Sequence, residues 1–252
     1  MRTRIPNGNL LEGPFLKNIL LFSVPIIISS ILQLLFNAAD VIVVGRFAGK
    51  TALAAVGSTG STINLIVNLC IGLSIGANVL VARYIGARDR AGVERAVHTA
   101  VLISIISGLL AGTALFFFAE SLLTLLDTPA TILGSAVSYL RAYAIGIPAS
   151  IVYNFGTAIL RAKGDTVRPL YFLVVAGIVN VVLNLILVIF FHLGAVGVGI
   201  ATAAAQIVSA VLVILCLVHE ESEVRLNPSR IRICKEEAIE MIKIGLPAGI
   251  QS

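Results

Sequence analysis

The sequence predicts an all-α integral membrane protein, and two observations carry this prediction. Hydrophobic residues make up 58% of the 252 residues and charged residues only 12%, whereas soluble domains carry about 25% charged residues. Apolar runs of helix length also recur along the chain, separated by short segments with the Gly, Pro and charged residues typical of loops. The lipid bilayer is therefore the expected surroundings of the protein.

Six apolar runs are long enough to cross a bilayer, because about 20 apolar residues span its hydrocarbon core. We expect these spans at 18–44, 53–82, 96–118, 131–160, 169–191 and 195–218. The first run is too long for a cleaved signal peptide, so it is expected to remain as a span. The predicted organisation is a cytoplasmic N-terminal segment (1–17), a six-span lobe (18–218), a cytoplasmic linker (219–237) and the start of a seventh, truncated helix (238–252).

The basic residues predict the orientation in the cytoplasmic membrane. If the N-terminus is cytoplasmic, 15 of the 18 Lys and Arg residues lie in cytoplasmic segments, and Arg46 and Lys50 lie outside. This bias follows the positive-inside rule, so a cytoplasmic N-terminus is expected. The net charge of +5 does not predict a nucleic-acid partner, because the basic residues occupy loops between apolar runs rather than a stripe with aromatic residues.

A short motif near the start of the first span recurs at the end of the chain. Residues 22–30 and 244–252 share the same spacing from Pro to Ser and an Ile between them. If this is a true repeat, a second six-span half begins there with the same orientation as the first, related to it by an axis along the membrane normal. The chain would then be one half of a transporter, and the missing C-terminal lobe would be its partner.

Asp40 is the only acidic residue inside an apolar run, and an ionisable group in hydrocarbon is costly and usually functional. With a rise of about 1.5 Å per residue, Asp40, Asn184 and Thr202 are expected roughly 7 to 11 Å below the outer surface, with Asn180 one turn deeper. One carboxylate with amide and hydroxyl oxygens suits a hard monovalent cation, or a proton on Asp40. Packing between helices is the alternative role for the Asn and Thr side chains.

Further polar side chains are candidates for lining a path through the lobe, although each could equally serve helix packing. They are Gln33, Asn37, Asn64, Asn68, Tyr139, Asn154 and Gln206. Asp40 could also be a structural partner of Arg46 or Arg141. Pro25 and Pro148 are candidate gating positions, or simply tolerated helix kinks.

Enzyme chemistry has little support in the sequence. The three histidines are far apart and none has a second ligand at a metal-site spacing, so no metal is expected beyond Na⁺ at the cation site. No Gly-rich segment has the context or the Lys-Ser/Thr ending of a phosphate-binding loop. We therefore expect neither an enzyme nor a cofactor, and Na⁺ or H⁺ as the energy source.

Several stretches together resemble the multidrug and toxic compound extrusion (MATE) transporters, in particular their DNA-damage-inducible, DinF-like branch. The resemblance runs from about Leu11 to Ser252. The matching stretches are Pro25 with 37–40, 54–57, 76–89, 139–141, 146–148 and 160–169.

The resemblance implies a twelve-helix exporter of two six-helix lobes, driven by a sodium or proton gradient, with this chain as the N-terminal lobe and the start of the seventh helix. It also implies that Asp40, Asn180 and Thr202 occupy positions of the cation site. In several members of the family the position of Asn184 holds a second carboxylate. Because Asn184 is an amide, a mechanism with two carboxylates does not carry over.

The expected function is cation- or proton-coupled export of drugs, organic cations or amphipathic metabolites across the cytoplasmic membrane. Two alternatives stay open. A flippase for lipid-linked precursors from the same superfamily would show a strongly cationic central cavity. A non-transporting membrane scaffold or accessory subunit would have no use for the polar stripe around Asp40.

Overall fold

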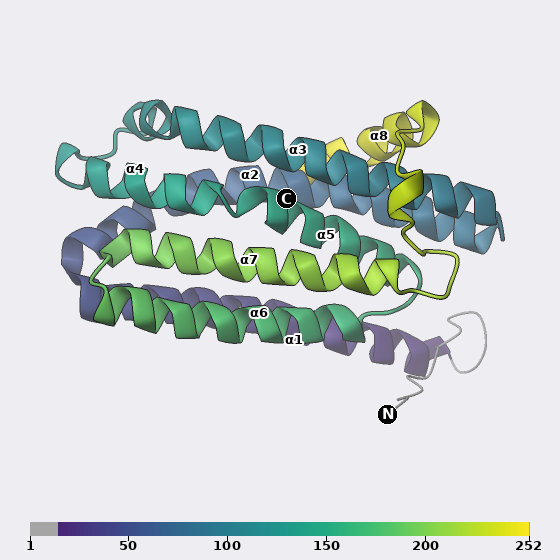
Figure 1. The fold of residues 1–252 in the computed structure, drawn as a ribbon, viewed down its shortest axis with the longest axis horizontal. Helices are drawn as coiled ribbons and strands as arrows, with labels where there is room; N and C mark the ends of the chain where they lie inside the picture. The colour runs from purple at the N-terminus through teal and green to yellow at the C-terminus, as the bar shows by residue number, and fades with distance from the viewer. Residues whose placement is uncertain (1–14, 252) are drawn as a thin grey trace.

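The computed structural model describes residues 15–251, and all regular structure within this range is helical (Figure 1). This confirms the predicted all-α class. The α-helices are α1 (Phe15–Val43), α2 (Gly49–Gly86), α3 (Arg90–Leu125), α4 (Ala130–Ala144), α5 (Ile147–Ala162), α6 (Val167–Leu185), α7 (Gly194–Val218) and α8 (Lys235–Gln251). Two π-helical turns, η1 (Val44–Ala48) and η2 (Ile186–Phe190), and one 3₁₀ turn, η3 (Pro228–Arg230), complete the described part.

Length and apolar composition qualify four continuous helical segments for crossing a membrane, and the bent pair of α4 and α5 qualifies as a fifth span. The first segment, Phe22–Gly86, contains both α1 and α2, which run in opposite directions (Figure 1). The chain reverses near Gly49, whose φ of 84° is accessible to glycine at little cost. The six expected crossings thus correspond to α1, α2, α3, the α4–α5 pair, α6 and α7.

Several helix ends differ from the sequence-based expectation. Residues 45–50, expected as a loop, continue the helix through η1, and residues 131–160, expected as one span, form two helices bent by 45°. The α3 helix begins at Arg90 instead of 96, because the Asp89 carboxylate accepts a hydrogen bond from the backbone N–H of Gly92 at 3.0 Å. Hydropathy marks the part of a helix in hydrocarbon, whereas caps determine where the helix begins.

The linker also ends earlier than expected, because α8 begins at Lys235 rather than at 238. Two carboxylates, Glu236 and Glu237, lie in its first turn, where negative charge stabilises a helix. Residues 1–14 of the expected N-terminal segment, and Ser252 at the end of the repeated motif, lie outside the described residues.

The bend between α4 and α5 packs directly on α3. A Cβ atom at Gly108 would lie 2.8 Å from the Cα of Pro148, and one at Gly112 would lie 2.9 Å from the backbone oxygen of Ala144. Small residues spaced four apart allow helix backbones to approach this closely in a membrane. Pro148 is the second residue of α5, where its missing N–H breaks no helical hydrogen bond. It therefore helps to begin a helix and does not kink one.

The α8 helix crosses α2 at an even closer distance. A Cβ at Gly76 would lie 2.1 Å from the backbone oxygen of Met241, and one at Gly72 would lie 2.1 Å from the Cα of Gly249. Near this crossing, the Arg83 guanidinium donates hydrogen bonds to the Glu240 carboxylate. A second ion pair joins Arg95 of α3 to Glu237 of α8 at 2.6 Å. Backbone contact and these two ion pairs thus hold α8 against α2 and α3.

The chain segments with most of the basic residues gather at one end of the helix bundle. The α2–α3 turn, the α5–α6 connection and the α7–α8 linker all lie at the right of Figure 1, whereas the α1–α2 turn and the α3–α4 loop lie at the left. Chain direction thus brings together the loops that the positive-inside rule assigned to one side.

Gly76→Ala is predicted to loosen α8 from α2, because a methyl group at this position would meet the Met241 backbone rather than a movable side chain. We expect a loss of about 1 to 3 kcal/mol of stability and faster amide hydrogen exchange in α8. Gly57→Ala is the matched control, because a Cβ at Gly57 on the same helix meets nothing within 4 Å. Equal exchange rates in the two variants would contradict the packing described here.

Candidate functional site

The structure brings four predicted site residues from three helices into one polar network. Asp40 of α1 accepts a hydrogen bond from the side-chain amide of Asn184 on α6. The same amide nitrogen lies 3.4 Å from Oδ1 of Asn180, whose own amide donates to Oγ1 of Thr202 on α7 at 3.3 Å. Asn180 and Thr202 are therefore connected to the Asp40 carboxylate through Asn184. The common depth inferred from the sequence thus corresponds to direct contact.

The α6 helix carries the centre of this network because it packs against both α1 and α7. Asn180 and Asn184 are four residues apart, so they share one face of the helix, and their side chains are 5% and 1% exposed. One turn away, Gly177 leaves room for the ring of Phe36 on α1. A Cβ at Gly177 would lie 1.9 Å from the Cζ of that ring. This fit brings α1, and with it Asp40, close to α6.

One acceptor in the network is buried without a hydrogen-bond partner. Oδ1 of Asn184 has none in the described part of the chain, and a buried, unpaired amide oxygen is costly. The oxygen lies beside a carboxylate that is only partly buried. A cation could be held by oxygens of Asp40, Asn184, Asn180 and Thr202, all hard ligands. A proton on Asp40 would instead turn the carboxylate into a donor.

The secondary polar residues lie in different surroundings. Gln33 and Asn37 are exposed on α1, in line with Asp40, and Asn64 is exposed on α2 while Asn68 is partly buried. The Asn154 amide donates to the backbone oxygen of Ser150 on its own helix at 2.8 Å. Among residues 15–251, none of these five side chains forms a hydrogen bond with Asp40.

Gln206 and Tyr139 lie close to the site, together with a residue that the sequence analysis did not single out. The Gln206 amide donates to the hydroxyl of Tyr143 at 3.3 Å, and the rings of Tyr143 and Tyr139 lie 6.2 Å apart. Tyr139 also packs on α7 one turn from Thr202, where a Cβ at Gly199 would lie 3.0 Å from the Tyr139 backbone oxygen. The spacing of Tyr143, four residues after Tyr139, was the sequence signal that could have identified it.

Two structural alternatives can be compared with these contacts. Arg141, considered as a partner of Asp40, lies 3.9 Å from Glu120 and donates to the backbone oxygen of Phe116 at 3.3 Å. Glu120 belongs to α3, which extends beyond its expected end at 118, so a second carboxylate lies in a spanning helix, near its end and largely exposed. Pro25 lies inside α1, where Ser29 donates to its backbone oxygen at 2.8 Å, and α1 continues past it.

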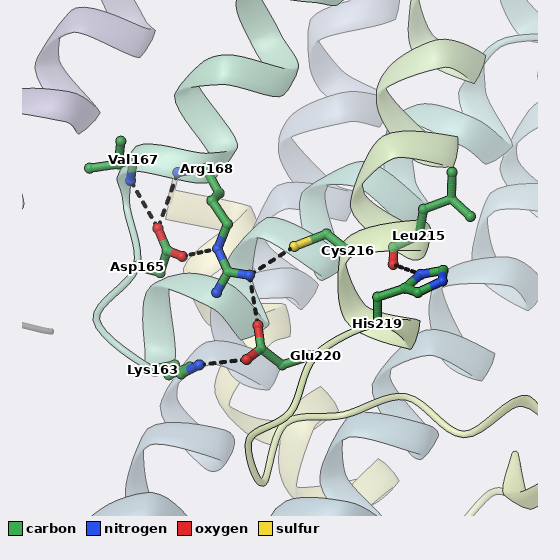
Figure 2. A network of polar contacts seen from close by, with 8 residues as sticks. All are labelled: Lys163, Asp165, Val167, Arg168, Leu215, Cys216, His219 and Glu220. Atoms are coloured by element: carbon green, nitrogen blue, oxygen red, sulfur yellow. Dashed lines mark hydrogen bonds and ion pairs between the residues drawn. The ribbon is translucent and has the colours of Figure 1, made fainter. Parts of the chain in front are cut away.

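A second polar network joins α5, α6 and α7 at the basic end of the bundle (Figure 2). Glu220, directly after α7, lies 2.8 Å from Nζ of Lys163 and 2.7 Å from Nη1 of Arg168. Arg168 also pairs with Asp165, which accepts two backbone hydrogen bonds at the start of α6. The network therefore ties the start of α6 to the end of α7. The sequence showed these charges but gave no signal for their pairing.

Burial raises the pKa of Glu220, but hydrogen bonds from Lys163 and Arg168 outweigh this effect and lower it to about 2. Its side chain is only 8% exposed. In the described residues, no group of three or more His, Cys, Asp or Glu side chains is positioned to hold a metal ion. The Asp40 network is thus the candidate ion site, and the Glu220 network is a structural tie.

Comparison with known proteins decides the family. The MatE family model matches residues 25–186, which include Asp40, Asn180 and Asn184. The chain belongs to the MatE family. This confirms the resemblance seen in the sequence motifs, and nothing in the comparison distinguishes the DinF-like branch.

MatE relatives match nearly the whole chain. "Probable multidrug resistance protein YpnP" of Bacillus subtilis is 31% identical over 240 residues, which are 95% of this chain and 54% of that protein. "Multidrug export protein MepA" of Staphylococcus saprophyticus is 23% identical over 236 residues, 94% of this chain and 52% of that protein. The chain spans about half the length of the curated relatives it matches.

Solved MATE structures share the fold of this chain. A crystal structure of MATE in the bent conformation is 28% identical, with a TM-score of 0.89 over 97% of this chain and 55% of the other. An outward-facing MATE transporter gives 0.89 over 99% of this chain and 55% of the other, at 28% identity. An inward-facing MATE transporter has a TM-score of 0.79 over 86% of this chain and 50% of the other chain, at 27% identity. The lower score of the inward-facing structure accompanies a smaller aligned share of this chain.

Glu220→Gln is predicted to remove a pH-dependent part of the stability. Because the pKa of Glu220 is lowered from 4.5 to about 2, its contribution is present above about pH 4.5 and is lost as the pH falls towards 2. The shift corresponds to about 3 kcal/mol at neutral pH. Thermal unfolding of the purified protein between pH 7 and pH 3 measures it.

The wild type should lose stability below pH 4.5. Glu220→Gln should have a lower unfolding temperature than the wild type at pH 7, and this temperature should change less as the pH falls. Glu221→Gln is the control, because this neighbouring carboxylate is exposed and has no ion pair given for the described residues. If both variants behave alike, Glu220 does not hold α6 and α7 together.

Proposed function

We propose that this chain is the N-terminal lobe of a secondary transporter that exports drugs, organic cations or other amphipathic compounds in exchange for Na⁺ or H⁺. Two findings support a transporter: the chain belongs to the MatE family, and its relatives are named as multidrug export and multidrug resistance proteins. The expectation that the chain is not an enzyme agrees with this family. The single observation that carries the mechanism is the contact of Asp40 with Asn184 in the bundle.

Asp40 would carry the coupling ion. A carboxylate in a spanning helix is costly unless it binds a cation, takes up a proton or has polar partners. Here the direct partner is the Asn184 amide, with Asn180 and Thr202 behind it in the network; neutral groups stabilise the charge but do not neutralise it. Na⁺ and H⁺ would compete for the same carboxylate oxygens, so occupation by one excludes the other. A scaffold protein would gain nothing from such a site.

The exchange also needs a second state in which the ion can leave to the other side. The C-terminal lobe of the relatives, which lies beyond the half that this chain spans, would supply the opposing wall of the substrate path. Transport then depends on both lobes. We infer that α8, packed against α2 through backbone contact, would link the first lobe to the second.

Asp40→Asn in the transport-competent protein is predicted to lower gradient-driven efflux at least about tenfold, because a neutral amide provides one oxygen and no charge for the ion. Efflux from proteoliposomes with an imposed Na⁺ or H⁺ gradient measures this. Glu120→Gln is the matched control, since it removes a carboxylate from another spanning helix far out on α3. Unchanged efflux and ion dependence in Asp40→Asn would place the coupling ion elsewhere.

Asn184→Asp tests the same site in the opposite direction. It would place a second carboxylate beside Asp40 and so favour binding of a cation or a shared proton. We expect a shift in the pH or Na⁺ concentration of half-maximal efflux rather than a loss of transport. A variant with the wild-type ion dependence would show that the ion does not contact residue 184.

The orientation is tested by labelling single cysteines in a chain without Cys70, Cys216 and Cys234. A cysteine at Glu221 is predicted to react with an impermeant maleimide only after the cells are opened, whereas one at Lys50 should react in intact cells. Both positions are exposed. The opposite pattern would reverse the topology.

A further inference from the structure

The segment that connects α7 to α8 lies across the first turns of α3 and is fixed at two points. Nε2 of His98 lies 3.1 Å from both the backbone oxygen and the backbone nitrogen of Asn227. One residue further along α3, Oγ1 of Thr99 accepts a hydrogen bond from the backbone N–H of Cys234 at 3.1 Å. We call residues 227–234 the strap. Its position on α3 is set by side chains that are almost completely buried.

Between its two attachment points, the strap encloses a pocket of about 590 Å³ with α3. The lining combines about two turns of α3 with four residues of the strap. These residues are Ala91, Glu94, Arg95 and His98 of α3 and Ser229, Arg230, Ile231 and Arg232 of the strap. The pocket is therefore a product of the tertiary contacts and not of one helix alone.

The charge of the pocket is positive. Three guanidinium groups and one carboxylate line it. Arg95 pairs with Glu237 at 2.6 Å, and Arg230 pairs with Glu94 at 3.2 Å. Arg232 is exposed and has no carboxylate partner among residues 15–251. An arginine carries five N–H donors, so even the paired ones keep donors for another acceptor.

A neighbouring pocket shows that an excess of positive side chains is not a feature of every pocket at this end of the bundle. It lies on the other side of the Arg230–Glu94 pair, and three arginines and three glutamates line it. Of these two pockets, the one under the strap has the excess of guanidinium groups. Charge complementarity therefore favours an anion in the pocket under the strap over the neighbouring one.

The pocket lies where a membrane surface would be. From Arg90 to His98 the α3 helix rises about 12 Å, and exposed large apolar side chains of α3 begin two turns further on, with Ile105 and Ile106. Exposed apolar side chains lie beside the strap, with Ile233 at its end and Ile239 and Ile242 on α8, whose first turn holds Glu237 next to Arg95. A basic pocket beside an apolar surface matches the two parts of a lipid.

We propose that the pocket under the strap binds the phosphate group of an anionic phospholipid, with Arg232, Arg230 and Arg95 as donors and the acyl chains along Ile239 and Ile242. Guanidinium groups bind phosphate with charge-assisted, often bidentate hydrogen bonds, and basic pockets between spans at the cytoplasmic side bind lipid headgroups. The bound lipid would hold the strap, and with it the start of α8, against α3. This inference does not depend on the coupling ion or on the exported compound.

Short-chain phosphatidylglycerol added to the purified full chain tests the proposal, with phosphatidylcholine of the same chain length as the neutral reference. Phosphatidylglycerol should raise the thermal unfolding temperature in a saturable manner, and phosphatidylcholine should not. Arg232→Gln should raise the phosphatidylglycerol concentration needed for half-saturation about tenfold. Its unfolding temperature without lipid should stay that of the wild type, because Arg232 has no carboxylate partner among the described residues.

Lys243→Gln is the matched control, because it removes one exposed positive charge from α8 outside the pocket. Equal weakening in both variants would show a general attraction to anionic lipid and would overturn the proposal. Equal stabilisation by the two lipids would overturn it as well. Glycerol 1-phosphate separates the sources: if it saturates the protein at the same concentration as the lipid, the ligand is a soluble phosphate ester and the lipid assignment is wrong.

Discussion

The structure depends on one constraint of the bilayer, which is that a polar group in hydrocarbon must find its partner inside the protein. Helices meet this requirement for the backbone. The side chains of Asp40, Asn180, Asn184 and Thr202 meet it for each other except at Oδ1 of Asn184, which stays without a partner in the described residues. The constraint explains why the strongest polar contact between α1 and α6 lies at the one carboxylate of α1. The same constraint distinguishes Asp40, a carboxylate within a span that has neutral polar partners, from Glu220 and Glu237, which form ion pairs near helix ends.

A second consequence of the bilayer concerns the way in which the helices approach each other. Lipid chains are as apolar as leucine, so burial of apolar surface alone gives little reason for helices to associate, and close van der Waals contact must contribute. Glycines provide it at several places, among them between α2 and α8, between α3 and the α4–α5 bend, and between α1 and α6. Each of these contacts leaves no space for a methyl group. Both the polar site and the glycine contacts therefore follow from the apolar surroundings that the lipid provides.

Much of this arrangement could be predicted from the sequence, because hydropathy and charge record the bilayer directly. The apolar runs predicted the spans, and a rise per residue predicted that Asp40, Asn184 and Thr202 share one depth. The run from 131 to 160 was predicted as one span, with a helix kink as one of two roles for Pro148. The structure divides it into two helices bent by 45° between Ala144 and Ile147, and this bend packs on Gly108 and Gly112. The strap on His98 and the pairing of Glu220 were missed because they join residues far apart in the chain. Whether the Asp40 network binds an ion stays a prediction.

The fit of the Phe36 ring over Gly177 gives the site a dependence on residues that have no charge. The contact between the ring and the glycine fixes the register between α1 and α6. Asp40 lies one turn after Phe36 and Asn184 two turns after Gly177, so this register also sets the distance between Asp40 and Asn184. Natural variation at Phe36 or Gly177 would thus alter the distance between a carboxylate and an amide without touching either. Sequences of this family that differ at the pair should differ together, with a smaller ring where the glycine has become larger.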